Sequence, residues 1–321
     1  MKRSDVIAIL FATAILAGGV HAQDYPSKPV RFVLGTAPGG STDTIARITA
    51  QQLNERWGKP VVVDNRPGAG GTIAADLVVK AQPDGYTLFV GGFGPSAMAG
   101  SIYPKLSYDP ARDFAHVTLL VSFPNVLVVR TNWPVIGLKE FIEQARAKPG
   151  TIKHGSSGTG SSGHAMAELI NMMAKINTIH VPYKSGPLAL TGVIVGDVDF
   201  ALIAPSSALP QLATGRIRAL AVTSLKANSR LPNVPPISSV LPGYDALEFH
   251  GLHAPAKTPK ALVTKLQRDV AAVLNTAEVK ARLDGIAMDL SASTPEEFTA
   301  FINRQIKTWA TVAKASNIRV D

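Results

Sequence analysis

The sequence contains no cysteine. This absence excludes a disulfide framework, a thiol nucleophile, and the attachment of a lipid through a cysteine at a processing site. Two hydrolase motifs are missing as well, because neither H-E-x-x-H nor G-x-S-x-G occurs in the chain. These absences favour a protein that binds a ligand without turning it over.

Also missing is an apolar run long enough to cross a bilayer. The apolar stretch at residues 6–20 falls short of the roughly 20 residues that a transmembrane helix needs. It follows Lys2-Arg3 and precedes Val20-His21-Ala22, which has the small side chains that signal peptidase requires. We therefore expect residues 1–22 to be a signal peptide cleaved after Ala22, and the mature protein to be free in the periplasm.

Positive charge is in excess, with 32 Lys and Arg against 23 Asp and Glu and a formal net charge of +9. The basic residues are dispersed and never form a run of five or more. Such dispersion is typical of a solvated surface, so we expect no nucleic-acid partner. A weaker contribution of this charge would be to steer anionic small molecules toward the protein.

Short β-branched runs alternate with amphipathic stretches along the chain. This alternation predicts an α/β fold with mostly parallel sheets. We expect strands at 30–34, 61–64, 86–90, 126–130, 152–155, 179–182, 198–204 and 217–223, and helices at 42–57, 138–147, 165–175, 259–275 and 295–315.

Two stretches, 121–125 and 241–244, read as crossings between two lobes. Residues 23–122 plus 246–321 would then form lobe 1, and residues 123–245 would form lobe 2. Two crossings make a hinge, and ligands of such α/β folds bind in the cleft between the lobes.

The stretch GTAPGGSTDT at 35–44 follows a predicted strand and opens a predicted helix. Its spacing fits a Walker A loop, except that Ser41 occupies the position of the phosphate-binding lysine. The backbone N–H groups of Gly39, Gly40, Ser41 and Thr42 would suit a carboxylate at the helix N-terminus. A plain strand-to-helix turn, with Ser41 or Thr42 as the N-cap, explains this loop by itself equally well.

A second loop, HGSSGTGSSGH at 154–164, is another donor-rich helix entrance. Its glycines also fit G-x-G-x-x-G, but no acidic residue follows at the distance that a dinucleotide site requires, so we expect no such cofactor. Two such loops suggest an anion with two acidic groups. His164 and Glu168 are four residues apart and could bind zinc with a third ligand, but such a pair is more typical of a helix-surface contact. We expect no metal.

Several segments resemble the Bug receptors, the substrate-binding proteins of tripartite tricarboxylate transporters, over nearly the whole mature length. These segments are 25–30 (YPSKPV), 38–43 (PGGSTD), 61–71 (VVVDNRPGAGG), 84–88 (DGYTL), 156–161 (SSGTGS) with His164, 181–184 (VPYK), 218–223 (RALAVT) and 254–255 (AP). The chain departs from the family at Ser185, where relatives have glycine, and at 235–240 (PPISSV), which puts that part of the hinge region in doubt.

The resemblance implies a two-lobed periplasmic binding protein of the Venus-flytrap type that closes around a small organic carboxylate and delivers it to membrane permease subunits. The ligand-binding positions that it implies, together with the strand ends expected in the cleft, are Gly39, Gly40, Ser41, Thr42, Phe93, Ser96, Ser156, Ser157, Gly158, Thr159, Gly160, Ser161, Ala204 and Ser206. Asp43 and His164 would brace the two loops. We expect a monomer without a cofactor.

No acidic residue is evident at the strand ends expected in the cleft, where Ala204 is apolar. We therefore predict a carboxylate that lacks an α-amino group, either a dicarboxylate or an aromatic acid whose apolar middle faces Phe93. Two other functions are left open. One is an exported hydrolase that uses Ser161 with His164, and the other is a loaded receptor that signals to a sensor kinase.

Overall fold

The computed structural model describes residues 25–320. The predicted signal peptide, residues 1–22, and its cleavage after Ala22 lie outside this range. Among the helices of residues 25–320, none combines the length and the hydrophobicity that crossing a bilayer would require.

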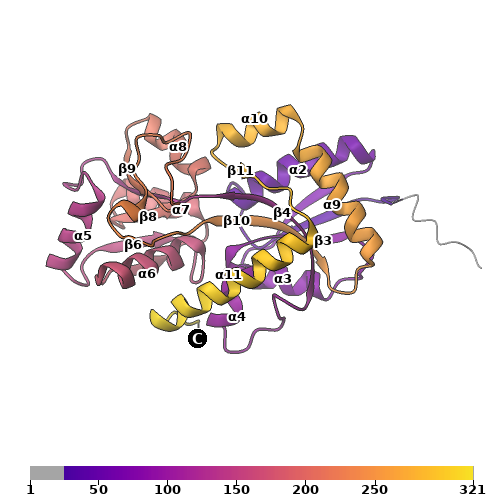
Figure 1. Ribbon diagram of the computed structural model, residues 1–321, viewed down its shortest axis with the longest axis horizontal. Coiled ribbons are helices and arrows are strands. Elements are labelled where there is room, and N and C mark those ends of the chain that lie inside the picture. The colour runs from indigo at the N-terminus through magenta and orange to yellow at the C-terminus, as the bar shows by residue number, and fades with distance from the viewer. Residues whose placement is uncertain (1–24, 321) are drawn as a thin grey trace, which may run out of the picture.

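Two β-sheets lie side by side along the long axis of the molecule (Figure 1). The six-stranded sheet has the order β11-β4-β10-β3-β1-β2, and the five-stranded sheet has the order β7-β6-β8-β5-β9. The first sheet consists of β1 (Val30–Leu34), β2 (Val61–Asn65), β3 (Thr87–Gly92), β4 (Phe114–Phe123), β10 (Glu248–Pro255) and β11 (Asp289–Leu290). The second consists of β5 (Val126–Arg130), β6 (Lys153–Ser156), β7 (Ile179–Pro182), β8 (Phe200–Ile203) and β9 (Ile217–Val222).

Both sheets are mixed, whereas the sequence predicted mostly parallel ones. β1 runs parallel to β2 and β3, and β6 runs parallel to β7 and β8. β10 runs antiparallel to β3 and β4, β11 to β4, and β5 to β8 and β9. The reason lies in the path of the chain: β4 leads toward the second sheet and β10 returns from it, so these paired strands run in opposite directions.

The chain changes sheets twice, between Phe123 and Val126 and between Val222 and Glu248. Both changes lie close to the predicted crossings. The exact division into lobes at 122/123 and 245/246 stays a prediction, because sheet membership does not by itself define where a lobe ends.

Strand β5 of the second sheet is apolar on both faces. Leu127 and Val129 of β5 pack into one core cluster, whereas Val126 and Val128 pack into another. Side chains alternate between the two faces of a strand, so every one of these residues is buried only because helices cover both sides. The covering helices are α5 (Leu138–Ala147), α6 (Ser162–Ala174), α7 (Gly186–Val195) and α8 (Pro205–Ala213).

Helices also cover both faces of the first sheet. They are α2 (Ser41–Trp57), α3 (Thr72–Val79), α4 (Ala99–Ile102), α9 (Lys260–Leu274), α10 (Ala277–Gly285) and α11 (Pro295–Ala315). In α2, Ile45, Ala46 and Leu53 lie on one face and are completely buried. The helix ends at Gly58, whose φ of 61° is left-handed, as the sequence predicted for a glycine stop.

Besides α3, α4 and α10, the sequence did not predict α7 and α8. In both helices the proline occupies the first turn, where its missing N–H is no loss. Packing against the second sheet then stabilises a helix in a segment whose glycine and proline residues are typical of a loop.

The last helix, α11, lies across the junction of the two sheets (Figure 1). It begins with a capping box between Thr294 and Glu297. Its Trp309 ring lies edge-on to Phe93 with centroids 4.7 Å apart. The same core cluster contains Ile102 from the first half and Ile170 from α6. This helix therefore joins the two halves through apolar contact on one side of the molecule.

Replacing Trp309 with alanine should lower the free energy of unfolding by about 3–5 kcal/mol, because it opens a cavity at the junction. Urea denaturation of the purified variant measures this loss. Lys307→Ala, an exposed position on the same helix, should stay within about 0.5 kcal/mol of wild type. Equal stability of both variants would contradict the role of α11 as a junction.

Candidate functional site

A cavity of about 430 Å³ lies at the carboxyl ends of strands from both sheets. Its wall consists of residues 35–37, 40–42, 67–71, 89–95, 157–158, 161–163, 183–187 and 202–204, together with Asn125, Ser207, Glu248 and His250. These segments follow or end β1, β2, β3, β6, β7 and β8. The carboxyl edge of an α/β sheet is where such folds bind ligands.

The first turns of several helices face this cavity. They belong to α2, α6, α7 and α8 and to the π-helical turn η3 (Gly94–Met98), and each contributes at least one residue to the cavity wall, whereas α3 contributes only its N-cap, Gly71. The N-terminus of a helix carries partial positive charge and N–H groups without an intrahelical acceptor. Helix starts that converge in this way favour a negatively charged group in the cavity.

Helices α2 and α6 leave their first-turn donors free of side-chain caps. The N-cap of α2 is Gly40, which has no side chain, and the side chain of the α6 N-cap, Ser161, accepts no hydrogen bond from the helix. The first intrahelical bonds are donated by Thr44 to Gly40 O and by Ala165 to Ser161 O, each 2.9 Å long. The N–H groups of residues 41–43 and 162–164 therefore have no acceptor within their helices.

The structure places eight of the predicted ligand-binding residues in the cavity wall. They are Gly40, Ser41, Thr42, Phe93, Ser157, Gly158, Ser161 and Ala204. The other six, Gly39, Ser96, Ser156, Thr159, Gly160 and Ser206, lie outside the wall. Ser96 is buried and its Oγ lies 3.3 Å from Nε2 of His253, in the interior of the first sheet.

Asp43 holds the first loop in place. Its carboxylate accepts hydrogen bonds from the backbone N–H of Gly39 at 3.0 Å, from Nε of Arg47 at 2.9 Å and from Nδ2 of Asn65 at 3.1 Å. Burial raises the pKa of Asp43, but these donors outweigh it and hold the pKa below its usual value. The carboxylate therefore stays ionised and holds the loop through the N–H of Gly39.

His164 supports the second loop in the same way. Its Nδ1 accepts the backbone N–H of Gly160 at 3.1 Å, and burial lowers the pKa of His164 to about 3, so the ring is neutral. Ser161 Oγ is buried and has no partner among the described residues. His164 therefore does not activate Ser161, and the pair lacks the hydrogen bond that a serine hydrolase requires.

Glu248, at the start of β10, is an acidic residue of the cavity wall that the sequence alone did not reveal. It does not lie at the strand ends that were expected to offer no acidic group, but it adds a carboxyl group to the cleft. Ser162 Oγ donates a hydrogen bond to Oε2 of Glu248, and the N–H of Phe249 donates to Oε1 at 3.2 Å. Burial dominates over these bonds and raises the pKa of Glu248 to about 7.

Other polar groups of the wall were not among the ligand-binding residues predicted from the sequence. His250 Nε2 lies 2.9 Å from Ser41 Oγ, which joins β10 to the first loop. Thr36 Oγ1 and His250 Nδ1 are buried without a partner among residues 25–320. Lys184, an exposed residue of the wall, supplies a positive charge. Its place in the VPYK segment was the one sequence clue to it.

Comparison with known proteins places the chain among solute-binding receptors. The family described as "Tripartite tricarboxylate transporter family receptor" matches residues 45–318. Protein BugT of Bordetella pertussis (strain Tohama I) is 31% identical over 321 residues, which cover 98% of this chain and 97% of BugT.

Solved structures confirm the predicted α/β binding-protein fold. The structure of R. palustris Rpa4515 with adipate has a TM-score of 0.89 and 34% identity, and the match covers 92% of this chain and 99% of that one. MatC from Rhodopseudomonas palustris with bound malate has a TM-score of 0.85 and 32% identity, over 90% of this chain and 99% of that one.

Replacing Glu248 with glutamine should change how stability depends on pH. The folded state binds a proton at Glu248 below about pH 7, whereas the unfolded chain binds it only near the ordinary glutamate pKa of 4.5. Between pH 4.5 and about pH 7 this proton contributes to the free energy of unfolding of wild type, and the contribution falls by about 3 kcal/mol in total as pH rises. The glutamine variant has no proton to lose and therefore lacks this change.

Urea denaturation of both proteins at pH 5, 6, 7 and 8 measures the effect as a difference, in which the titration of the other groups cancels. The difference in free energy of unfolding should shift in favour of the variant as pH rises. A difference that stays constant across this range would show that Glu248 titrates normally.

Proposed function

The chain belongs to the family of tripartite tricarboxylate transporter receptors, which are solute-binding proteins and not enzymes, and we propose that it captures a small organic carboxylate in the periplasm and delivers it to membrane permease subunits. The observation that carries the carboxylate is the convergence of helix starts from both sheets on one cavity. Unpaired N–H donors and helix dipoles stabilise a negative group without a fixed cation.

A ligand with two acidic groups fits this arrangement best. The N–H donors of α2 belong to the first sheet and those of α6 to the second, so one carboxylate would bind at each side of the cavity. A volume of about 430 Å³ lies within the range of pockets that enclose small molecules. The structures with adipate and with malate contain dicarboxylates, which supports the same class for this chain.

Glu248 does not by itself favour an amino acid as the ligand. Its two carboxyl oxygens already accept hydrogen bonds from Ser162 and Phe249. Its pKa near 7 means that a large share of the group is neutral at neutral pH, and a neutral carboxyl attracts an ammonium group only weakly. We therefore propose that dicarboxylates bind more tightly than α-amino acids.

Closure around the ligand would take place at the two crossings. We propose lobe boundaries at 122/123 and 245/246, with the ligand drawing the two loops together. Such closure is favourable only in proportion to the contacts that the ligand gains with both lobes. The apolar contact of α11 with both halves would limit the movement to the opposite, open side of the cavity.

Adipate and malate should raise the melting temperature of the purified protein, whereas aspartate and glutamate at the same concentration should not. A ligand present at 100 times its Kd stabilises the folded state by about 2.7 kcal/mol, which corresponds to several degrees. Propionate and sodium chloride at matched ionic strength serve as controls. Stabilisation by the amino acids alone would refute the proposed ligand class.

Replacing Gly40 with valine should abolish the binding of whichever dicarboxylate the screen identifies, with a loss of at least about 100-fold in affinity by calorimetry. The new side chain would stand in the cavity wall at the start of α2, where an added Cβ meets no protein atom closer than 3.9 Å. The folded state therefore has room for it, whereas the ligand does not.

Gly137→Val is the matched control. Gly137 is also the N-cap of a helix, α5, with extended backbone, no side-chain cap and open space around an added Cβ, but it lies outside the cavity. Both variants should lose similar stability at the cap. Equal ligand affinity of the two variants would exclude the first loop from the binding site.

A further inference from the structure

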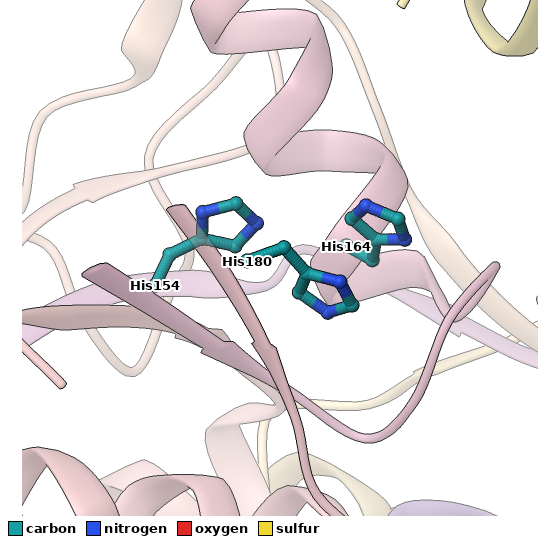
Figure 2. Close-up of side chains that lie close together, drawn as sticks. All are labelled: His154, His164 and His180. Carbon is teal, nitrogen blue, oxygen red and sulfur yellow. The ribbon is translucent and has the colours of Figure 1, made fainter. Parts of the chain in front are cut away.

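Three histidines lie close together beside the second loop (Figure 2), and none of them belongs to the cavity wall. His154 lies on β6, His164 in the first turn of α6, and His180 on β7. His154 and His180 are direct neighbours in the parallel pairing of β6 with β7. One nitrogen from each ring lies within 4.8 Å of the others. These three residues are the histidine cluster.

Glu168, one turn after His164 on α6, adds a carboxylate to the histidine cluster. Its Oε1 lies 3.9 Å from Nε2 of His154 and 4.0 Å from Nε2 of His164. Ligand atoms around a tetrahedral zinc ion are about 3.3 Å apart. The three histidine nitrogens and the carboxylate therefore lie near one another but farther apart than the ligands of a bound zinc ion, so side chains have to turn for an ion to be bound.

The hydrogen bonds around His154 determine where its proton lies. Thr178 Oγ1 donates its single proton to Oδ1 of Asn171 at 3.1 Å. Towards Nδ1 of His154, 2.9 Å away, Thr178 must then act as the acceptor. Nδ1 therefore carries the proton, and Nε2 has a free lone pair. This Nε2 atom is completely buried and has no hydrogen-bond partner among the described residues.

Asn171 extends this arrangement to Glu168, because its Nδ2 donates to Oε1 of Glu168 at 3.3 Å. The chain of bonds from His154 through Thr178 and Asn171 ends on the carboxylate. Outer-sphere hydrogen bonds of this kind, from the second ring nitrogen of a histidine and to a carboxylate, orient the ligands of metal sites.

The proton of His180 is assigned in the same way. Ser156 Oγ donates to the carbonyl of Gly158 at 3.0 Å, so it accepts from Nε2 of His180, which lies 2.6 Å away. Nδ1 of His180 is then the ring nitrogen with a free lone pair. His154 and His180 thus each present an unprotonated nitrogen. The third ring, His164, lies beside the carboxylate of Glu168.

From these contacts we propose that His154, His180, Glu168 and His164 bind a divalent transition-metal ion, and Zn²⁺ suits this set of nitrogen and oxygen donors best. Burial lowers the pKa of His164 to about 3, the pKa of His180 to about 4, and the pKa of His154 well below its usual value. Neutral imidazole is the form that binds metals, so protons do not compete at neutral pH.

The ion links the site to the second loop through His164. In the metal-free protein His164 Nδ1 accepts the N–H of Gly160, and its ring is stacked on His180 with centroids 3.6 Å apart. Lone pairs of two parallel stacked rings do not converge on one point, so His164 has to turn and to move its proton to Nδ1. The bond to Gly160 is then lost, and the loop loses one of its supports.

Calorimetric titration of the untagged chain, stripped with EDTA, should show one Zn²⁺ per chain. Co²⁺ in the same site should give the visible absorption of a four-coordinate ion. His154→Phe keeps the packing against Phe200 but removes the free lone pair, and should weaken Zn²⁺ binding by more than about 100-fold. Glu168→Gln, at the partly exposed edge of the cluster, should weaken it by about 10-fold to 100-fold.

His116→Phe is the control, because His116 is also buried with an unpartnered Nε2, contacts His253, and belongs to no group of three potential metal ligands among residues 25–320. Its affinity for Zn²⁺ should equal that of wild type. If His154→Phe fails to fold, the Co²⁺ spectrum of wild type and the Zn²⁺ titration of Glu168→Gln still test the proposed metal site. Failure of wild type to bind one Zn²⁺, or equal binding by Glu168→Gln, would overturn the metal site.

The coupling to the loop rests on the proposed function and has its own measurement. Saturating Zn²⁺ should weaken adipate binding to wild type several-fold, and adipate should weaken Zn²⁺ binding by the same factor, as linkage requires. The Zn²⁺ titration without adipate tests the site alone. Zinc binding without any change in adipate affinity would overturn the coupling through Gly160, and zinc binding without any adipate affinity would count against the proposed ligand instead.

Discussion

Backbone N–H groups in the first turn of a helix have no acceptor within that helix. In this protein several helix starts face one cavity, and the two largest of them, α2 and α6, lack side-chain caps there. Buried donors of this kind favour a bound acceptor, and the helix dipoles favour a negative one. The mixed sheets, the return of the chain through β10 and the apolar junction formed by α11 all serve to bring these helix starts to the same place.

The loops that carry the donors are held by polar residues on their far sides. Asp43 fixes the first loop and His164 fixes the second, each by accepting a backbone N–H four residues earlier in the chain. Glu248 and Ser162 connect the second crossing to the start of α6. Because Asp43 and His164 each accept a backbone N–H of the loop that they hold, a change of charge at either residue would alter the support of that loop.

Sequence reasoning found the two loops because each combines glycine, serine and threonine with a predicted strand before it and a predicted helix after it. It also found the α/β class, the glycine stop after α2 and the segments that identify the family. It missed strands β4, β10 and β11 and helices α3, α4, α7, α8 and α10, since packing against a sheet can stabilise a segment whose own sequence pattern is weak. The sheets proved mixed because direction depends on the path of the chain between lobes, which no local pattern records.

Local sequence was enough to locate the backbone donors at the starts of α2 and α6, because a helix start after a glycine-rich turn is a local property of the chain. The side chains that stand beside these donors depend on the tertiary fold. Glu248 is in strand β10, more than eighty residues from Ser162, and their contact depends on the return crossing. The histidine cluster is similar: the four-residue spacing of His164 and Glu168 is visible in the sequence, but His180 joins them only because β6 pairs with β7. Contacts between distant segments depend on strand register, and register is fixed by burial over the whole fold.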